Sequence, residues 1–266
     1  MSRQALLIQA KYTKSLEIHE SIAYDGVENF SFSQYDPNNI NHAIGRDSLF
    51  VYDFNFAPMN RKGRMSRRQE RRKKHLENKF GFYPRGEIQA STRRMFARLL
   101  ARTKGELTLH TDNHYAYRNA IKSLPREDQD RLTHLITPGK AARNYRNRLF
   151  AINHLDMLTR HHLCAYKRET IAFSKHSIAM IENFSMLMVH KNFMRPLFTK
   201  KQKTDPFSNK HSPAMRLGLT KKILTFHEFF AVRVTKAQVK LSEDWEKFVD
   251  KVDPTSRRTI AAYSGN

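Results

Sequence analysis

Hydrophobic and polar side chains alternate along three stretches of the chain, and this period of two residues predicts β-strands. The stretches cover residues 20–25, 48–56 and 107–112. They carry Asp25, Asp53 and Asp112, respectively. In the third stretch the leucines point to one side of the strand, and Asp112 points to the other side toward polar surroundings. A short apolar run at 132–136, followed by a Pro-Gly turn, predicts one more strand.

A period near 3.6 residues predicts helices between and after these strands. Ser91 and Thr92 are expected to cap a helix that ends before Gly105. Further helices are expected at 115–124, 145–173, 177–192, 219–234 and 241–252. The helix at 145–173 contains no Pro or Gly and carries four polar residues on one face, namely Asn153, Asp156, Arg160 and Lys167. Strands that alternate with helices predict an α/β layer fold.

The chain is strongly basic, with 48 Lys and Arg against 25 Asp and Glu and a formal net charge of +23. This charge suits a phosphate backbone or an anionic membrane surface. No apolar run approaches the ~20 residues that span a bilayer, and the N-terminus lacks the apolar core of a signal peptide. The single cysteine, Cys164, excludes an internal disulfide and is expected to be a buried helix residue. A cytoplasmic protein without a membrane partner is therefore expected.

Positive charge is densest at residues 61–74, which contain nine Lys or Arg and one acid. Such a segment cannot face a core, so it is expected to be a solvated helix or loop that contacts DNA or RNA backbone. Its cations are Arg61, Lys62, Arg64, Arg67, Arg68, Arg71, Arg72, Lys73 and Lys74. A polar, basic linker with two prolines follows residue 196. We therefore expect an N-terminal segment at 1–19, a main domain at 20–196 with a basic insertion at 60–80, and a basic extension at 197–266.

Acidic side chains in so basic a chain indicate metal-dependent chemistry on nucleic acid. Asp112 is the first candidate, and Asp53 is a rival for a place at the same site. His110, Asp112 and His114 alternate, so they could bind zinc if the strand continued, although a structural or substrate-contacting role for the histidines is preferred. Ser174 and Lys175 could form a nucleophile and base, but no oxyanion hole or nucleophile elbow accompanies them.

Several segments resemble the DDE-type transposases of bacterial insertion sequences, whose catalytic domain has the ribonuclease-H-like fold. The resemblance spans most of residues 16–222. It is carried by residues 22–32 (IAYDGVENFSF), 60–65 (NRKGRM), 111–114 (TDNH), 150–160 (FAINHLDMLTR) and 168–174 (RETIAFS). It implies a mixed sheet flanked by helices, with the first acid on the first strand, the second at the end of the fourth strand and the third on a later helix.

The resemblance implies Asp25 and Asp112 as the first two catalytic acids and metal ligands. The third would be Asp156 or Glu169. On one continuous helix these two lie about 140° apart and roughly 20 Å apart along the axis, so they cannot serve one site together. Asp156 is preferred because an arginine, Arg160, follows it closely.

The implied activity is DNA cleavage and strand transfer of an insertion sequence, with two Mg²⁺ or Mn²⁺ ions held by the three carboxylates. DNA, as element ends and as target, is the implied partner. The resemblance is compatible with a homo-oligomer on DNA and with a place at the bacterial nucleoid. Arg160 and Lys167 join the basic segment as expected DNA contacts.

The chain departs from these relatives in lacking the N-terminal zinc ribbon and helix-turn-helix that bind the element's ends. Residues 1–19 are too few for either. The protein could be the product of a truncated element. The alternative is a non-catalytic nucleic-acid-binding protein derived from a transposase, and a basic ribosome-associated protein is a more distant third. Only an enzyme has a reason to gather Asp25 and Asp112 against their repulsion.

Overall fold

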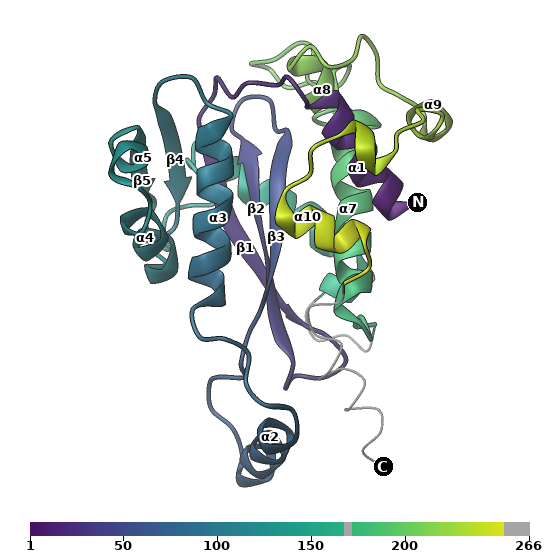
Figure 1. Ribbon diagram of the computed structural model, residues 1–266. Helices are drawn as coiled ribbons and strands as arrows, with labels where there is room; N and C mark the ends of the chain where they lie inside the picture. The colour runs from purple at the N-terminus through teal and green to yellow at the C-terminus, as the bar shows by residue number, and fades with distance from the viewer. Residues whose placement is uncertain (168–171, 253–266) are drawn as a thin grey trace.

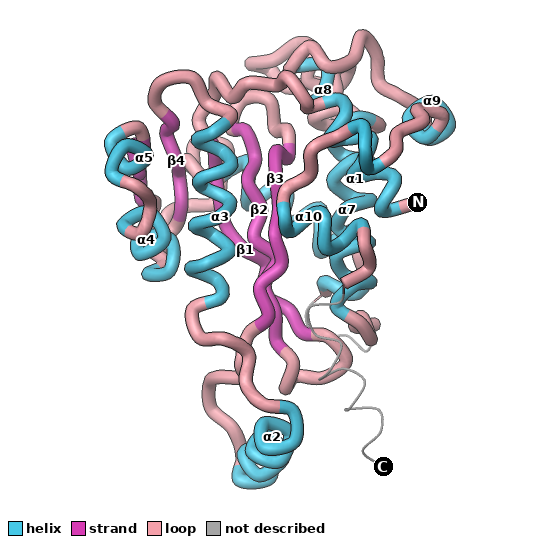
Figure 2. Tube along the Cα trace, viewed as in Figure 1, coloured by secondary structure: helices cyan, strands magenta, loops and turns pink. Residues whose placement is uncertain are grey.

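The structure is a computed structural model that describes residues 1–167 and 172–252 (Figure 1). Within that part of the chain, five strands form one mixed sheet in the order β3-β2-β1-β4-β5. They are β1 (Ile22–Phe30), β2 (Pro37–Gly45), β3 (Val51–Pro58), β4 (Leu107–Thr111) and β5 (Leu132–Ile136). β2 is antiparallel to β1 and β3, whereas β4 is parallel to β1 and β5. Helices flank this sheet (Figure 2), so the predicted α/β layer fold is confirmed.

Helices α3 (Glu87–Ala101) and α6 (Phe150–His162) cover opposite faces of the sheet. Tyr24 and Asp25 are successive residues of β1, so their side chains point to opposite faces. The Tyr24 hydroxyl lies 2.7 Å from Thr92 Oγ1 on α3. His42 is paired with Asp25 across β1 and β2, and its Nε2 lies 2.9 Å from Asp156 Oδ1 on α6. Asp25 therefore faces α6, on the far side of the sheet from α3.

Three helices from distant parts of the sequence pack together beside β3 (Figure 1). They are α1 (Ser2–Tyr12), α7 (Ser177–Phe193) and α10 (Glu243–Val249). Gln9 Nε2 on α1 donates to the Val51 carbonyl oxygen at 3.1 Å. Trp245 Nε1 on α10 donates to the Phe54 carbonyl oxygen at 3.2 Å. N-terminal and C-terminal segments thus complete the same hydrophobic core.

Helix α2 (Arg67–Phe80) stands away from the body of the molecule (Figure 1) and buries none of its residues. A capping box starts it, because the Ser66 side chain accepts from the Gln69 N–H while the Gln69 side chain accepts from the Ser66 N–H. The expectation of a solvated basic helix is therefore confirmed for most of residues 61–74. The remaining helices are short: α4 (Tyr115–Lys122), α5 (Arg126–Asp130), α8 (Pro213–Arg216) and α9 (Phe226–Phe230). No helix in the described residues is both long enough and apolar enough to span a membrane.

Strand β2 was not predicted, and β1 is longer than predicted. β1 does not end at Gly26 but continues to Phe30. The sequence of β2 is rich in polar residues, and three of them, Asn39, Asn41 and His42, are buried in the structure. Asn41 Nδ2 donates to Asn55 Oδ1 at 2.7 Å, and this pairing satisfies polar groups inside the sheet. Hydrophobic alternation does not reveal this strand, because buried amides and an imidazole interrupt its buried apolar residues Ile40, Ala43 and Ile44.

The prediction of a single helix at 145–173 is wrong. α6 ends at His162, Leu163 is extended, and a 3₁₀ turn follows at Cys164–Tyr166. Cys164 is exposed on that turn and is not the buried helix residue that was expected. The predicted caps Ser91 and Thr92 are likewise wrong, because both residues lie inside α3 and are buried there. The helix predicted at 219–234 reduces to α9, whereas α7 begins at the predicted residue.

Candidate functional site

The sheet places Asp25 and Asp112 at matching positions on neighbouring parallel strands. Ala23 of β1 is paired with His110 of β4, and each aspartate follows two residues later. Asp112 comes directly after the last residue of β4. Because β2 adds a strand that the sequence did not reveal, Asp112 follows the fourth strand of the chain. Gly105, with φ +78°, makes the left-handed turn that leads into β4.

Helix α6 brings Asp156 to the same place, and His42 holds it there. His42 is fully buried, with Nε2 2.9 Å from Asp156 Oδ1 and Nδ1 3.2 Å from the Ile40 carbonyl oxygen. Contacts at both ring nitrogens hold the imidazole in place, and the contact at Nε2 fixes the orientation of the carboxylate. His42 was missed in the sequence because it lies on the unpredicted strand.

A cavity of about 600 Å³ lies between these elements, and we call it the acidic cavity. Asp25, Asp112 and Asp156 all line it, together with Glu28. Asn153 and Arg160 also line it from α6, so three of the four polar residues predicted to share one helix face do so. Lys167 is exposed beyond the 3₁₀ turn and does not line this cavity. Arg143, His154 and Tyr117 are lining residues that sequence reasoning missed.

Burial and neighbouring negative charge perturb Asp25. Burial, as the largest cause, and the charges of Asp156 and Asp112 together raise the pKa of Asp25 to about 6. The Gly26 N–H, which donates to Asp25 Oδ1 at 2.7 Å, acts in the opposite direction. The Tyr117 hydroxyl also donates to Asp25 Oδ1, at 3.2 Å. A carboxyl group with such a pKa in a cavity is a typical sign of a functional site.

Glycine is required directly after Asp25. A Cβ atom added at Gly26 would lie 2.4 Å from Asn39 Oδ1 and 2.7 Å from Asn41 Oδ1. Asn39 lines the acidic cavity, and its Oδ1 is buried without a hydrogen-bond partner among the described residues. The Asp-Gly pair of β1 therefore lets two amide side chains of β2 approach the floor of the cavity.

The donor set of the acidic cavity suits a hard divalent cation, because carboxylate oxygens are the ligands that Mg²⁺ and Mn²⁺ prefer. Asp112 Oδ1 accepts the His114 N–H at 2.9 Å, which orients that carboxylate at the start of α4. In the described residues, however, no three His, Cys, Asp or Glu side chains are close enough together to form a metal site. The three aspartates share a cavity without forming a closed coordination sphere, so an ion would have to draw them together.

Asp53, the rival candidate, lies elsewhere. It is on β3, and its Oδ2 accepts from Arg98 Nε of α3 at 2.7 Å. It therefore lies on the face of the sheet opposite to Asp25 and is neutralised there. Asp53 has no part in the acidic cavity.

The alternating histidines do not form a zinc site with Asp112. His114 lines the acidic cavity, whereas His110 is buried and does not. Burial, as the largest cause, and Arg46, whose Nη1 lies 3.3 Å from His110 Nε2, lower the pKa of His110 to about 4. Ser174 and Lys175 likewise do not line the cavity. Glu169, the alternative third acid, lies outside the described residues.

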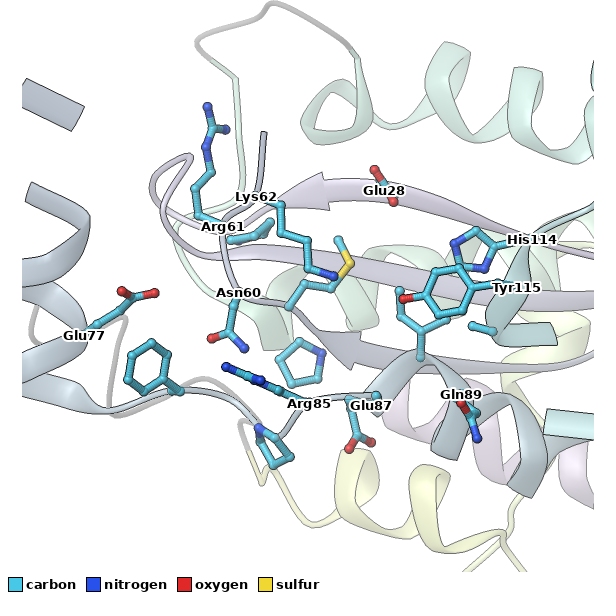
Figure 3. Close-up of a pocket in the computed structure, with 18 of the residues that line it drawn as sticks. Glu28, Asn60, Arg61, Lys62, Glu77, Arg85, Glu87, Gln89, His114 and Tyr115 are labelled. Atoms are coloured by element: carbon cyan, nitrogen blue, oxygen red, sulfur yellow. The ribbon is translucent and has the colours of Figure 1, made fainter. Parts of the chain in front are cut away.

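The basic segment contributes to a second cavity. Arg61, Lys62 and Lys73 line a cavity of about 810 Å³ (Figure 3). The other cations of the segment are exposed, and most of them lie on α2: Arg64, Arg67, Arg68, Arg71, Arg72 and Lys74. Glu28 and His114 line both cavities, so the two are adjacent.

No protein-family model matches the chain, and neither the search of curated proteins nor the search of solved structures found a match. The function must therefore be inferred from the geometry of the site and from the residues that form it.

Proposed function

We propose that the protein is a DDE-type transposase that cleaves DNA and transfers a strand with the help of divalent metal ions. The observation that carries this proposal is that Asp25, Asp112 and Asp156 line one cavity. Their order also supports it, with one acid on β1, one directly after the fourth strand and one on the later helix α6. This is the arrangement that the transposase resemblance implies.

The finer fold that we propose is ribonuclease-H-like. The mixed sheet supports it, with β1, β2 and β3 as an antiparallel unit and β4 and β5 parallel to β1. The position of the acids at the end of β4 and in the middle of β1 supports it further. The proposal includes DNA as the partner, as a duplex bound through the exposed cations of α2.

In this mechanism Asp25, Asp112 and Asp156 would hold Mg²⁺ or Mn²⁺, with two ions expected. Two bound ions activate a water or a 3′-hydroxyl and stabilise the leaving oxygen of a phosphodiester. The chain's own residues prepare the site for them. His42 orients Asp156, and the Gly26 N–H and the Tyr117 hydroxyl orient Asp25. Arg143 and Arg160 line the same cavity and would attract the scissile phosphate.

A non-catalytic nucleic-acid-binding protein is the second candidate. It is favoured by the absence of a closed three-ligand group in the described residues. The net charge of +23 would serve it equally well. The raised pKa of Asp25 argues against it, because a binding protein gains nothing from three neighbouring aspartates that repel one another.

The proposal is tested by nicking of supercoiled plasmid and joining of oligonucleotides in Mn²⁺. Loss of one metal ligand removes several kcal/mol of transition-state stabilisation, so Asp112→Asn should lower the rate roughly 10³-fold. Asp25→Asn and Asp156→Asn should do the same. DNA binding without metal should change less than about twofold, because affinity for the phosphate backbone comes from Lys and Arg and these variants replace none of them.

Asp130→Asn is a matched control. Asp130 is exposed on α5 and forms only a surface ion pair with Arg126, at 3.2 Å. This variant should retain full activity. Wild-type protein that neither nicks nor joins DNA in Mn²⁺, or nicking that survives all three site substitutions, would favour the binding protein.

A further inference from the structure

The second cavity lies beside the acidic one, and we call it the stem cavity because it opens where the chain leaves the sheet toward α2. The loop after β3 forms one wall, and the N-terminal ends of α3 and α4 form the other (Figure 3). Its volume of about 810 Å³ is in the range of pockets that enclose a ligand of several hundred daltons. Glu28 and His114 line both cavities, so a chain-like ligand could pass directly from one to the other.

The walls of the stem cavity are held in place before any ligand arrives. Asn60 Nδ2 donates to the Tyr83 carbonyl oxygen at 2.9 Å, and the Tyr83 N–H donates to Asn60 Oδ1 at 3.0 Å. The Tyr83 hydroxyl reaches Asp36 Oδ1 at 2.5 Å. These bonds join the segment before α2 to the segment after it, so the stem of the protruding helix has a defined shape.

The charges in the stem cavity favour an anion. Two of its acids are already engaged, because Glu77 pairs with Lys73 at 3.5 Å and Glu87 pairs with Arg94 at 3.2 Å. Arg61, Lys62 and Arg85 form no ion pair with any described residue. Arg61 Nε is also buried without a hydrogen-bond partner in the described structure. Three cations without an ion pair in the described residues therefore line the cavity, against one such acid, Glu28, and positive charge is in excess.

Exposed aromatic rings accompany these cations. Phe82 and Tyr115 line the stem cavity with 69% and 57% of their surface exposed, which is unusual for large apolar side chains. The ring of His114 lies 4.9 Å from that of Tyr115. In Figure 3 the Lys62 side chain points toward Tyr115. Exposed rings beside cations are typical of sites that bind unpaired bases, with the rings stacking on bases and the cations contacting phosphates.

We propose that the stem cavity binds one or more unpaired nucleotides of the DNA strand next to the phosphodiester in the acidic cavity. This inference rests on the proposed function and adds the state of the substrate, a duplex with a single-stranded segment at the reacting position. The faces of a base become available to Phe82 and Tyr115 only when the base leaves the duplex stack. Duplex DNA alone would contact the exposed cations of α2 and leave these rings unused.

The test compares binding of two fluorescein-labelled DNAs in EDTA, a blunt duplex and the same duplex with a three-nucleotide single-stranded tail. Stacking on aromatic rings contributes enough per base that Tyr115→Ala or Phe82→Ala should weaken binding of the tailed duplex roughly 5- to 100-fold. Binding of the blunt duplex should change less than about twofold. Emission of 2-aminopurine at the first tail position should fall on binding to the wild type and remain high with Tyr115→Ala.

Three controls separate this site from general effects. Phe226→Ala removes another exposed ring, on α9, which is 50% exposed, and should change neither affinity. Joint replacement of Arg67, Arg68, Arg71 and Arg72 by alanine should weaken both DNAs equally and reduce the salt dependence. Tyr115→Trp should preserve the preference for the tail, which separates stacking from any damage to the fold of α4.

Equal losses for the blunt and tailed duplexes, or no loss for either, would overturn the proposal. The measurement needs no metal and no catalysis, so it is independent of the nicking assay. If the tail preference is present but the aspartate variants still nick, the proposed reaction fails and the single-strand site stands. If the aspartates prove essential but the tail preference is absent, only the stem-cavity proposal fails.

Discussion

Asp53 and Asp25 lie on the same sheet and have opposite electrostatic surroundings. Asp53 faces α3, where Arg98 Nε lies 2.7 Å from its Oδ2 and Arg98 Nη1 lies 2.9 Å from Asp244 Oδ2. Burial lowers the pKa of Arg98, but Asp53 and Asp244 outweigh this effect and raise it. Asp25 faces two further aspartates and forms no ion pair with any described residue. The protein compensates a carboxylate where it serves the fold and leaves it uncompensated where a cation from solution could bind.

The largest effect on stability is expected on replacement of Arg98, the ion-pair partner of Asp53. Arg98→Met would leave Asp53 as a buried charge without its ion-pair partner and would leave Asp244 with Arg94 alone, and breaking such a buried pair costs about 3 kcal/mol of unfolding free energy. Urea denaturation at pH 7.5 measures this loss. Adding Asp53→Asn to Arg98→Met should recover part of it. A loss below about 1 kcal/mol would mean that the two faces differ less than their geometry indicates.

A smaller change in unfolding free energy, of opposite sign, is expected on replacement of Asp25. The folded pKa of Asp25 is about 6, raised from 3.8, so the native state holds the proton more tightly than the unfolded chain does. The stability associated with that proton is complete below pH 3.8 and is lost as the pH rises through about 6. Asp25→Asn should therefore stabilise the protein at pH 8 without divalent metal, by about 1–2 kcal/mol after allowance for partial exposure.

The pH dependence provides the control for this prediction. The gain from Asp25→Asn should vanish at pH 3.5, because the wild-type carboxyl group is then protonated in both states. Asp53→Asn should destabilise the protein at pH 8, since it removes one of the two carboxylates that pair with Arg98. Thermal unfolding at the two pH values gives both results. A stabilising Asp53→Asn would contradict the comparison.

The smallest effect concerns added metal. An ion that binds only the folded state stabilises it by about 1.4 kcal/mol at ten times its dissociation constant, which raises Tm by about 2–4 °C for a chain of this size. Mg²⁺ should raise the Tm of the wild type relative to EDTA and should raise that of Asp25→Asn and Asp112→Asn much less. Equal shifts in all three would place the ion elsewhere.

Sequence patterns predicted part of the difference between Asp25 and Asp53. The three strand-borne aspartates were found from alternation, because Asp25, Asp53 and Asp112 all lie on or directly after strands. The face of the sheet that each aspartate occupies could not be predicted, because the pairing of β1 with β3 runs through β2, which was not predicted. His42 was not identified as a site residue because it lies on that strand. The helix that carries Asp156 was found, but its end was not, because Leu163 adopts an extended conformation in a stretch without Pro or Gly.

The basic helix could be predicted from charge alone, but the stem cavity could not. Arg61, Lys62 and Lys73 are close together in sequence, whereas Arg85 and Tyr115 reach the cavity from other elements. The reciprocal bonds of Asn60 and Tyr83 join the segments before and after α2, and the packing of α4 against α3 brings Tyr115 to the same place. Such long-range pairing of amide and backbone groups leaves no periodic signal in the sequence.

The packing of α1 against α7 and α10 also determines when the hydrophobic core can close during synthesis of the chain. A ribosome adds residues slowly enough that on the order of ten seconds or more separates the emergence of α1 from that of α10. Until Trp245 arrives to cover Phe54, the apolar side of β3 is open and is a surface on which chaperones could act. A chain interrupted before α10 would carry all three aspartates and still lack a closed core. Translation to near Val249 is therefore needed before the hydrophobic core beside β3 is complete.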